Sequence, residues 1–178
     1  GLKELSDAAA ESLSKHKRSL SLAGLKELSD AAAESLSKHK GYYLFLNGLK
    51  ELSDAAAESL SKYKGNYLRL DGLNELSEAA AESLSKYKDD LWLNGLTELS
   101  DSAAKSLSKH KGTLSLDGLT ELSDAAAKCL LKFKDNYLML PRLKELSDAA
   151  AESLSKYKGN YLELDGLNEL SDAAAESL

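Results

Sequence analysis

Residues 43–72 read YLFLNGLKELSDAAAESLSKYKGNYLRLDG, and this stretch decides the fold. At each end, as in Tyr67 to Leu70, leucines alternate with variable residues, which is the period-two pattern of a strand buried on one side. The apolar residues between the two ends recur at spacings of three and four, which predicts one buried helix face. These residues are Leu49, Leu52, Ala56, Leu60 and Tyr63.

The beginning of this helix carries its own signals. Ser53 is suited to cap the first amide groups of a helix, and Asp54 follows at the positive end of the helix dipole. Glu58 and Lys62 are four residues apart in the favourable orientation, although an exposed pair of this kind adds little stability. Stacking between neighbouring units must therefore supply most of the stability.

The same unit recurs along the whole chain at spacings of 23 or 24 residues. Such a period predicts a solenoid, because one unit cannot bury its apolar face alone and must stack on its neighbours. We expect a single domain over residues 1–178, in which the eighth copy is partial. The copies begin at Gly1, Gly24, Gly48, Gly72, Gly95, Gly118, Arg142 and Gly166.

The composition excludes several classes of protein. The 178 residues include 39 Leu and 24 Ala but no Ile or Val, which disfavours an ordinary sheet core built on β-branched residues. A single Cys excludes an internal disulfide, and no stretch has the length of a membrane span. The net charge of −6 disfavours a nucleic-acid surface. We therefore expect neither nucleic-acid binding nor membrane insertion.

The pattern Leu-x-Leu-x-Gly-Leu-x-x-Leu-Ser-Asp-x-Ala-Ala resembles that of leucine-rich repeat proteins, particularly bacterial forms, over the whole chain. The resemblance implies an α/β solenoid with seven short parallel strands on a concave face and eight helices on a convex face. Strands lie about 4.7–4.9 Å apart whereas helices need about 8–10 Å, so such a stack must curve. Many of these families carry an inward Asn where this chain has Leu49, Leu73 and Leu96, and the cysteine-rich caps of secreted members are missing.

The residue between the two strand leucines changes from copy to copy, whereas the scaffold positions hardly change. Strand alternation places this column on the exposed concave face. It is flanked by a tyrosine column that occurs only in copies with the longer loop, so these tyrosines either pack over that loop or face a ligand. The binding residues that we predict from both columns are Tyr43, Phe45, Tyr67, Arg69, Trp92, Tyr137, Met139, Tyr161 and Glu163.

These columns are rich in aromatic residues, Arg and Met, which are typical of binding hot spots. They favour a non-enzymatic scaffold that binds a protein or peptide. Two alternatives remain open: glycan binding by the concave aromatic residues, and a structural or self-assembling repeat. In the second alternative, homo-oligomers form through the solenoid ends, because the first and eighth copies look like interior copies and lack polar caps.

A third column, which includes Asn47, Asp71, Asn94 and Asp117, precedes the glycine of each copy. Asn and Asp are common in turns because their side chains bond to nearby backbone groups. We expect these side chains to close the turn, and the alternative is a carboxylate ladder for Ca²⁺.

The remaining candidates for chemistry have simpler interpretations. His16, His39 and His110 share a repeat position with Tyr63 and Phe133, which indicates ring packing near the helix end rather than a metal site. No nucleophile elbow or phosphate loop is present, so we expect no enzyme activity, cofactor or metal.

Two further substitutions interrupt the helices. Cys129 replaces a helix Ser, a near-isosteric exchange with no base nearby in the repeat to activate a thiol. Lys105 and Lys128 replace Glu in two adjacent copies, which either docks an acidic partner or forms a solvated face.

Overall fold

The computed structural model describes residues 1–133 and 137–177, and within them it contains seven strands and eight helices. The strands are β1 (Leu20–Ser21), β2 (Tyr43–Phe45), β3 (Tyr67–Arg69), β4 (Asp90–Trp92), β5 (Leu114–Ser115), β6 (Tyr137–Met139) and β7 (Tyr161–Glu163). The helices are α1 (Asp7–Ser14), α2 (Asp30–Ser37), α3 (Asp54–Leu60), α4 (Glu78–Leu84), α5 (Asp101–Leu107), α6 (Asp124–Leu130), α7 (Asp148–Leu154) and α8 (Asp172–Ser177).

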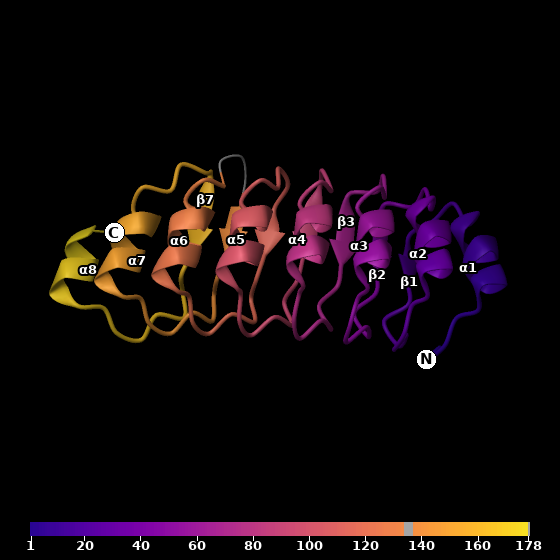
Figure 1. Ribbon diagram of the computed structural model, residues 1–178, viewed down its shortest axis with the longest axis horizontal. Coiled ribbons are helices and arrows are strands. Elements are labelled where there is room, and N and C mark those ends of the chain that lie inside the picture. The colour runs from indigo at the N-terminus through magenta and orange to yellow at the C-terminus, as the bar shows by residue number, and fades with distance from the viewer. Residues whose placement is uncertain (134–136, 178) are drawn as a thin grey trace.

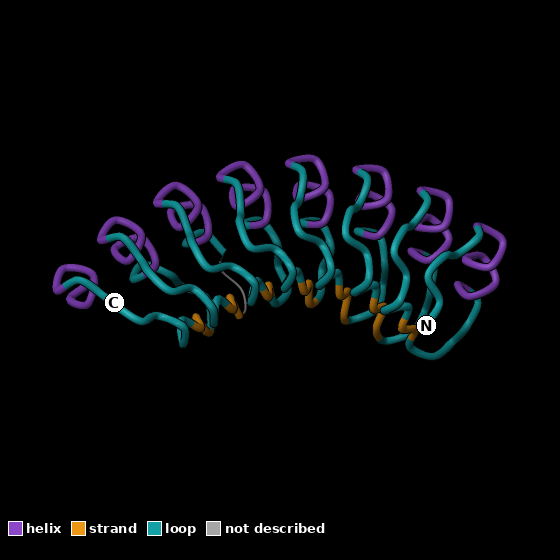
Figure 2. The backbone as a smooth tube through the Cα atoms, turned by 90° about the horizontal axis from the view of Figure 1, so that it is seen from below, coloured by secondary structure: helices purple, strands orange, loops and turns teal. Residues whose placement is uncertain are grey.

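The strands form one parallel sheet in chain order, and each repeat advances the sheet by one strand. The pairing places equivalent leucines side by side, as in Leu44, Leu68 and Leu91. The helices form a second layer, with the strands along the inner side of the arc and the helices along the outer side (Figure 1, Figure 2). The predicted curved α/β solenoid is confirmed.

The helices are shorter than the apolar spacing predicts. Helix α3 begins at Asp54, after the cap Ser53, whose hydroxyl accepts a hydrogen bond from the Ala56 amide at 3.0 Å. Leu49 instead closes a turn by donating its amide to Leu46, and Leu52 lies in the extended connection before the helix. The assignment of these two leucines to a helix face is wrong, because the chain needs an extended crossing from the sheet layer to the helix layer. Tyr63, assigned to the same face, also lies outside the helix, which ends at Leu60.

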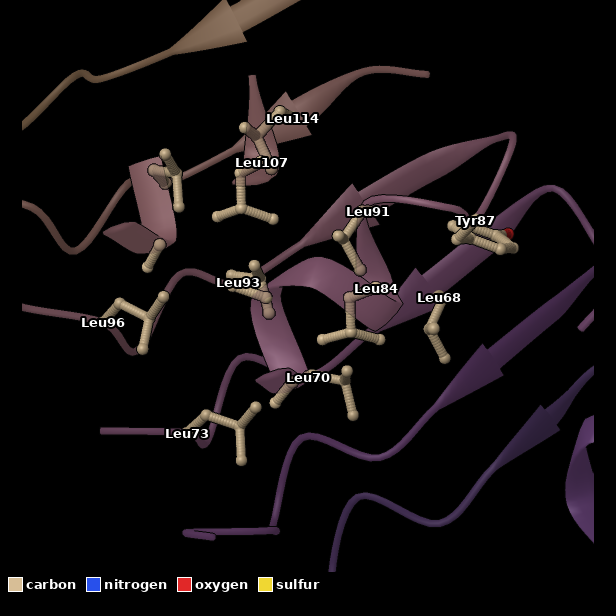
Figure 3. Packing of buried hydrophobic residues seen from close by; sticks show 14 of the residues in the cluster. Leu68, Leu70, Leu73, Leu84, Tyr87, Leu91, Leu93, Leu96, Leu107 and Leu114 are labelled. Carbon is tan, nitrogen blue, oxygen red and sulfur yellow. The ribbon is translucent and has the colours of Figure 1, made fainter. Parts of the chain in front are cut away.

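Leucines from both layers meet between sheet and helices and form one core. The strand leucines, such as Leu68 and Leu70, face helix leucines such as Leu84, and all three are fully buried (Figure 3). Small residues such as Ala80 and Ala81 are fully buried on the inner side of the helix. A helix of about two turns is not stable alone in water, so this core holds it in place.

Serine caps also connect neighbouring helices. Each cap donates its hydroxyl to the aspartate at the first helical position of the preceding copy, for example Ser77 to Asp54. Copy four begins its helix with Glu78 instead, and the next cap, Ser100, contacts Ser102. The cap thus stabilises its own helix and links it to the preceding one, a second role that the sequence alone did not reveal.

A buried column of rings runs along the solenoid where each helix ends. Neighbouring rings are nearly parallel, with centroids 6.2–6.4 Å apart. Burial raises the pKa of Tyr157 to about 12, and it raises the pKa values of Tyr63 and Tyr87 further. The predicted ring-packing role is confirmed for His39 and His110 but not for His16, which is exposed. The stack consists of His39, Tyr63, Tyr87, His110, Phe133 and Tyr157.

Tyrosine and histidine side chains at this position differ in whether their polar atoms reach a hydrogen-bond partner. Tyr63 and Tyr87 donate their hydroxyls to the carbonyls of Gly41 and Gly65, at 2.7 and 2.6 Å. The shorter ring of His110 has both nitrogens buried and without a hydrogen-bond partner within the described part of the chain, and the same holds for His39.

None of the helices described is long and apolar enough to cross a membrane.

Candidate functional site

The variable residues between the two strand leucines lie side by side in one column on the concave face of the sheet. The strand register pairs Phe45 with Arg69 and Arg69 with Trp92. The column then continues through Ser115 and Met139. Because neighbouring strands are about 4.7–4.9 Å apart, side chains in one column touch across the strands. The sheet thus brings together residues that are 23 or 24 positions apart in sequence.

The N-terminal cluster, which we define as Tyr43, Phe45, Arg69 and Trp92, is one continuous stack. The rings of Tyr43 and Phe45 are 4.2 Å apart and nearly parallel. The guanidinium carbon of Arg69 lies 5.2 Å from the centre of the Phe45 ring and 4.2 Å from that of Trp92. Arg69 is therefore held between two aromatic faces, a favourable cation–π geometry.

Asp71 fixes the other end of Arg69. Its Oδ2 accepts hydrogen bonds from Arg69 Nε at 2.8 Å and Nη2 at 2.7 Å. The two side chains are 28% and 15% exposed, so solvent screens this ion pair less than the exposed helix pairs. Arg69 is consequently preorganised, with only part of its donor set used by Asp71.

The predicted turn-closing role of the third column is wrong for Asp71 and Asn94. The turns are closed by backbone bonds, such as that from the Leu73 amide to the Leu70 carbonyl. Asp71 Oδ1 instead accepts from the Asn94 amide, and Asn94 Oδ1 accepts from the Asp117 amide, both at 3.2 Å. These side chains link neighbouring copies because the concave spacing brings each one close to the next backbone.

Tyr67 packs against a residue that we did not predict as part of the site. Its ring lies 5.3 Å from that of Tyr42, the most exposed large apolar side chain at 57%. A hydrogen bond with Tyr42 raises the pKa of Tyr67, with smaller effects from the charges of Tyr42 and Asp90. The signal for Tyr42 was its unusual place beside another tyrosine, because other copies carry Gly-Asn-Tyr there.

The C-terminal cluster, which we define as Tyr137, Met139, Tyr161 and Glu163, is more open. Tyr137 and Tyr161 are 48% and 46% exposed, and their rings are tilted with centroids 5.7 Å apart. Burial raises the pKa of Glu163, and the charges of Asp165 and Asp117 raise it further. This half of the concave face is therefore acidic, whereas the N-terminal cluster carries a cation.

Ser115 separates the two clusters. It is fully buried between Trp92 and Met139 in the variable column, and its hydroxyl lies 2.6 Å from Asn94 Oδ1 and 2.7 Å from Asp117 Oδ1. Next to it, the indole nitrogen of Trp92 is covered and lacks a hydrogen-bond partner among the described residues. Eight of the nine predicted residues thus form two clusters rather than one patch, and the ninth, Tyr67, packs against Tyr42.

The other candidates lie outside the concave face. Cys129 is half-buried on helix α6 and packs against the core. His16 is exposed. In the described ranges 1–133 and 137–177, no group of three or more His, Cys, Asp or Glu side chains is arranged to hold a metal.

No protein-family model matches the chain, and no curated protein sequence matches it. In structure it is similar to an internalin (InlF) from Listeria monocytogenes strain 4b F2365. The TM-score is 0.52 at 18% sequence identity, over 91% of this chain and 45% of that chain. The chain has a leucine-rich repeat fold.

The likeness to the internalin concerns the fold alone, because the identity of 18% is low. This leucine-rich repeat chain spans less than half the length of the internalin chain.

Proposed function

We propose that this leucine-rich repeat chain is a non-enzymatic recognition scaffold whose concave face binds a protein or peptide. The observation that carries the proposal is the N-terminal cluster, in which Arg69 is held between Phe45 and Trp92 and fixed by Asp71. A preformed arrangement of this kind loses little side-chain entropy when a ligand binds, and Arg and Trp are the residue types that dominate binding energy.

The chemistry of the face suggests the kind of segment that fits it. Arg69 favours a carboxylate or a backbone carbonyl of the ligand, and the rings of Tyr43 and Trp92 favour an apolar or aromatic side chain beside it. The C-terminal cluster, with Glu163 on the same strand as the exposed Tyr161, favours a basic side chain. An extended segment that lies along the face thus meets opposite charge preferences at its two ends.

The test is a selection from a displayed random peptide library on the wild-type chain. Selected peptides are then titrated against Phe45→Ala/Trp92→Ala, and a Glu152→Ala/Lys156→Ala variant on the convex face serves as the control. We expect the concave variant to lose at least tenfold in affinity, because truncating a hot-spot residue costs about 2 kcal/mol or more. Equal affinity for both variants and the wild type would remove the N-terminal cluster from the proposal.

A second pair of substitutions separates the two halves of the face. Tyr137→Ala/Tyr161→Ala changes only the C-terminal cluster, so loss of affinity in this variant but not in the first identifies that half as the binding half. Trp92 is the only Trp of the chain, so its fluorescence reports directly on ligands that reach the N-terminal cluster.

A further inference from the structure

Charge is divided between the two long edges of the solenoid. Every strand runs in the same direction, so all connections from a helix to the next strand lie along one edge and all those from a strand to the next helix lie along the other (Figure 1). The first edge carries Lys-x-Lys after each helix, as in Lys86 and Lys88, and we call it the basic rim. The second carries Glu-Leu-Ser-Asp or Glu-Leu-Ser-Glu, as in Glu98 to Asp101, and we call it the acidic rim.

The two rims have the same period. The Lys-x-Lys pair occurs in all seven copies that extend past their helix, and the acidic tetrapeptide occurs in all eight. Its glutamates are exposed, as are all the rim lysines in the described part of the chain. Because both patterns follow the 23- or 24-residue repeat, charges on one rim match those on the other copy by copy.

The acidic rim contains no cation in copies four to six. The residue before the rim glutamate is Lys3, Lys26 or Lys50 in the first three copies, but Asn or Thr in the next three. On the basic rim, Asp89 follows Lys88 in copy four, whereas no carboxylate follows Lys111 in copy five. The charge division is therefore clearest in copy five, where Lys105 also replaces a helix glutamate.

Shallow clefts lie on both rims at copies four and five. One cleft, of ≈ 540 Å³, is lined by four lysines, Lys86, Lys88, Lys109 and Lys111, with Glu82 and Tyr87. The other, of ≈ 430 Å³, is lined by Glu75 and Glu98 with uncharged neighbours. The lysine-lined cleft on one rim thus lies in the same copies as the cation-free part of the other.

We propose that the basic rim of this chain docks on the acidic rim of a second copy, in parallel register. A second copy fits better than an unrelated acidic polymer because its acidic rim repeats with the matching period. Each copy keeps one free rim of each sign, so the contact is heterologous and does not close. Copies therefore add side by side, with the ends of the solenoid uninvolved.

The contact is electrostatic, and this determines its strength. Exposed ion pairs are individually weak, so many must act together. Salt screens them, since the Debye length falls from about 30 Å at 0.01 M to about 8 Å at 0.15 M ionic strength. Association is therefore concentration-dependent and is lost in salt.

Sedimentation of two charge-reversal variants tests the proposal. One is Lys88→Glu/Lys109→Glu/Lys111→Glu on the basic rim, and the other is Glu75→Lys/Glu98→Lys/Glu121→Lys on the acidic rim. At about 20 mM salt the wild-type mass should rise with protein concentration, and at about 300 mM the association should weaken at least tenfold. Each variant alone should lose association at least tenfold, whereas an equimolar mixture of the two should regain it.

The results distinguish a second copy of the chain from an acidic polymer as the partner of the basic rim. A monomeric wild type at low salt and high concentration overturns the proposal, and so does a mixture of variants that fails to associate. Binding of polyglutamate without self-association would assign the basic rim to an acidic polymer instead, which also overturns it. The Phe45→Ala/Trp92→Ala variant should associate like the wild type, so this result is independent of concave-face recognition. Urea unfolding of each variant checks that the fold is intact.

Discussion

Two sets of stacked rings run along this molecule, one inside it and one on its concave face. The interior column repeats the same position in copies two to seven, and each inner ring lies between two others, as Tyr87 does between Tyr63 and His110. The concave rings differ from copy to copy and remain partly exposed, as do Phe45 and Trp92. An aromatic residue therefore stabilises the scaffold where it repeats and is buried, whereas it is available to a ligand where it varies and is exposed.

The largest effect is expected from Tyr87→Ala in the interior column. Tyr87 is 1% exposed and donates its hydroxyl to the Gly65 carbonyl, so the substitution leaves a cavity and an unpaired carbonyl. We expect a loss of about 3–5 kcal/mol in the free energy of unfolding, measured by urea denaturation. Tyr87→Phe is the control, because it keeps the ring and should cost about 0.5–1.5 kcal/mol. A loss below 1 kcal/mol in the free energy of unfolding for Tyr87→Ala would show that the interior column does not stabilise the fold.

The next effect concerns the glycines that allow the tyrosine rings to approach the loops. A Cβ added at Gly65 would lie 2.1 Å from the Tyr63 hydroxyl and 2.4 Å from the Gly41 carbonyl oxygen. Gly65→Ala should therefore destabilise the chain by about 1–3 kcal/mol through overpacking. At Gly1 the nearest atom would be 3.8 Å away, so Gly1→Ala is the matched control and should leave the urea midpoint unchanged. Equal midpoints for both variants would contradict the close approach.

The two histidines make the interior column sensitive to pH. Burial lowers the pKa of His110 and of His39, with opposing contributions from nearby backbone groups. The unfolded chain therefore binds more protons than the folded chain at and below about pH 6.5, and stability falls as the pH is lowered through this range. We expect the urea midpoint to decrease between neutral pH and about pH 5.

His110→Phe isolates this effect, because Phe133 shows that the column accommodates that ring. The variant should lose less stability on acidification than the wild type does. An equal loss in both chains would place the pH dependence elsewhere, for example in the exposed carboxylates. Among these, Lys15 and Lys38 lower the pKa values of Glu11 and Glu34, respectively.

The smallest effect on stability is expected on the concave face. Phe45→Ala/Trp92→Ala removes partly exposed rings and two cation–π contacts with Arg69, and it leaves the Arg69–Asp71 pair in place. We expect a loss of about 1–2 kcal/mol for the pair, well below that of Tyr87→Ala. A loss as large as that of Tyr87→Ala would indicate that the concave rings are part of the scaffold.

The repeat pattern predicted the fold because each copy carries the same residue types at the strand, cap and core positions. It predicted the concave columns for the same reason: Phe45, Arg69 and Trp92 follow strand alternation. It did not predict that Leu49 and Leu52 precede the helix, because a three- and four-residue spacing also fits an extended crossing over one core.

The links between copies were also not predictable from sequence, because they depend on register and side-chain direction. Examples are the hydroxyl of Ser77 on Asp54, the amide of Asn94 on Asp71, and the insertion of Arg69 between two rings. The division of the concave face at Ser115 has the same origin, since its burial depends on larger residues in the neighbouring strands.

Concave-face recognition is tested most directly by the affinity of one selected peptide for the wild type and for Phe45→Ala, measured through the fluorescence of Trp92. The urea midpoint of each chain is measured alongside. We expect Phe45→Ala to weaken binding at least tenfold while changing the free energy of unfolding by about 1 kcal/mol or less. Unchanged affinity, or a loss of stability as large as the loss for Tyr87→Ala, would contradict the assignment of the concave rings to recognition.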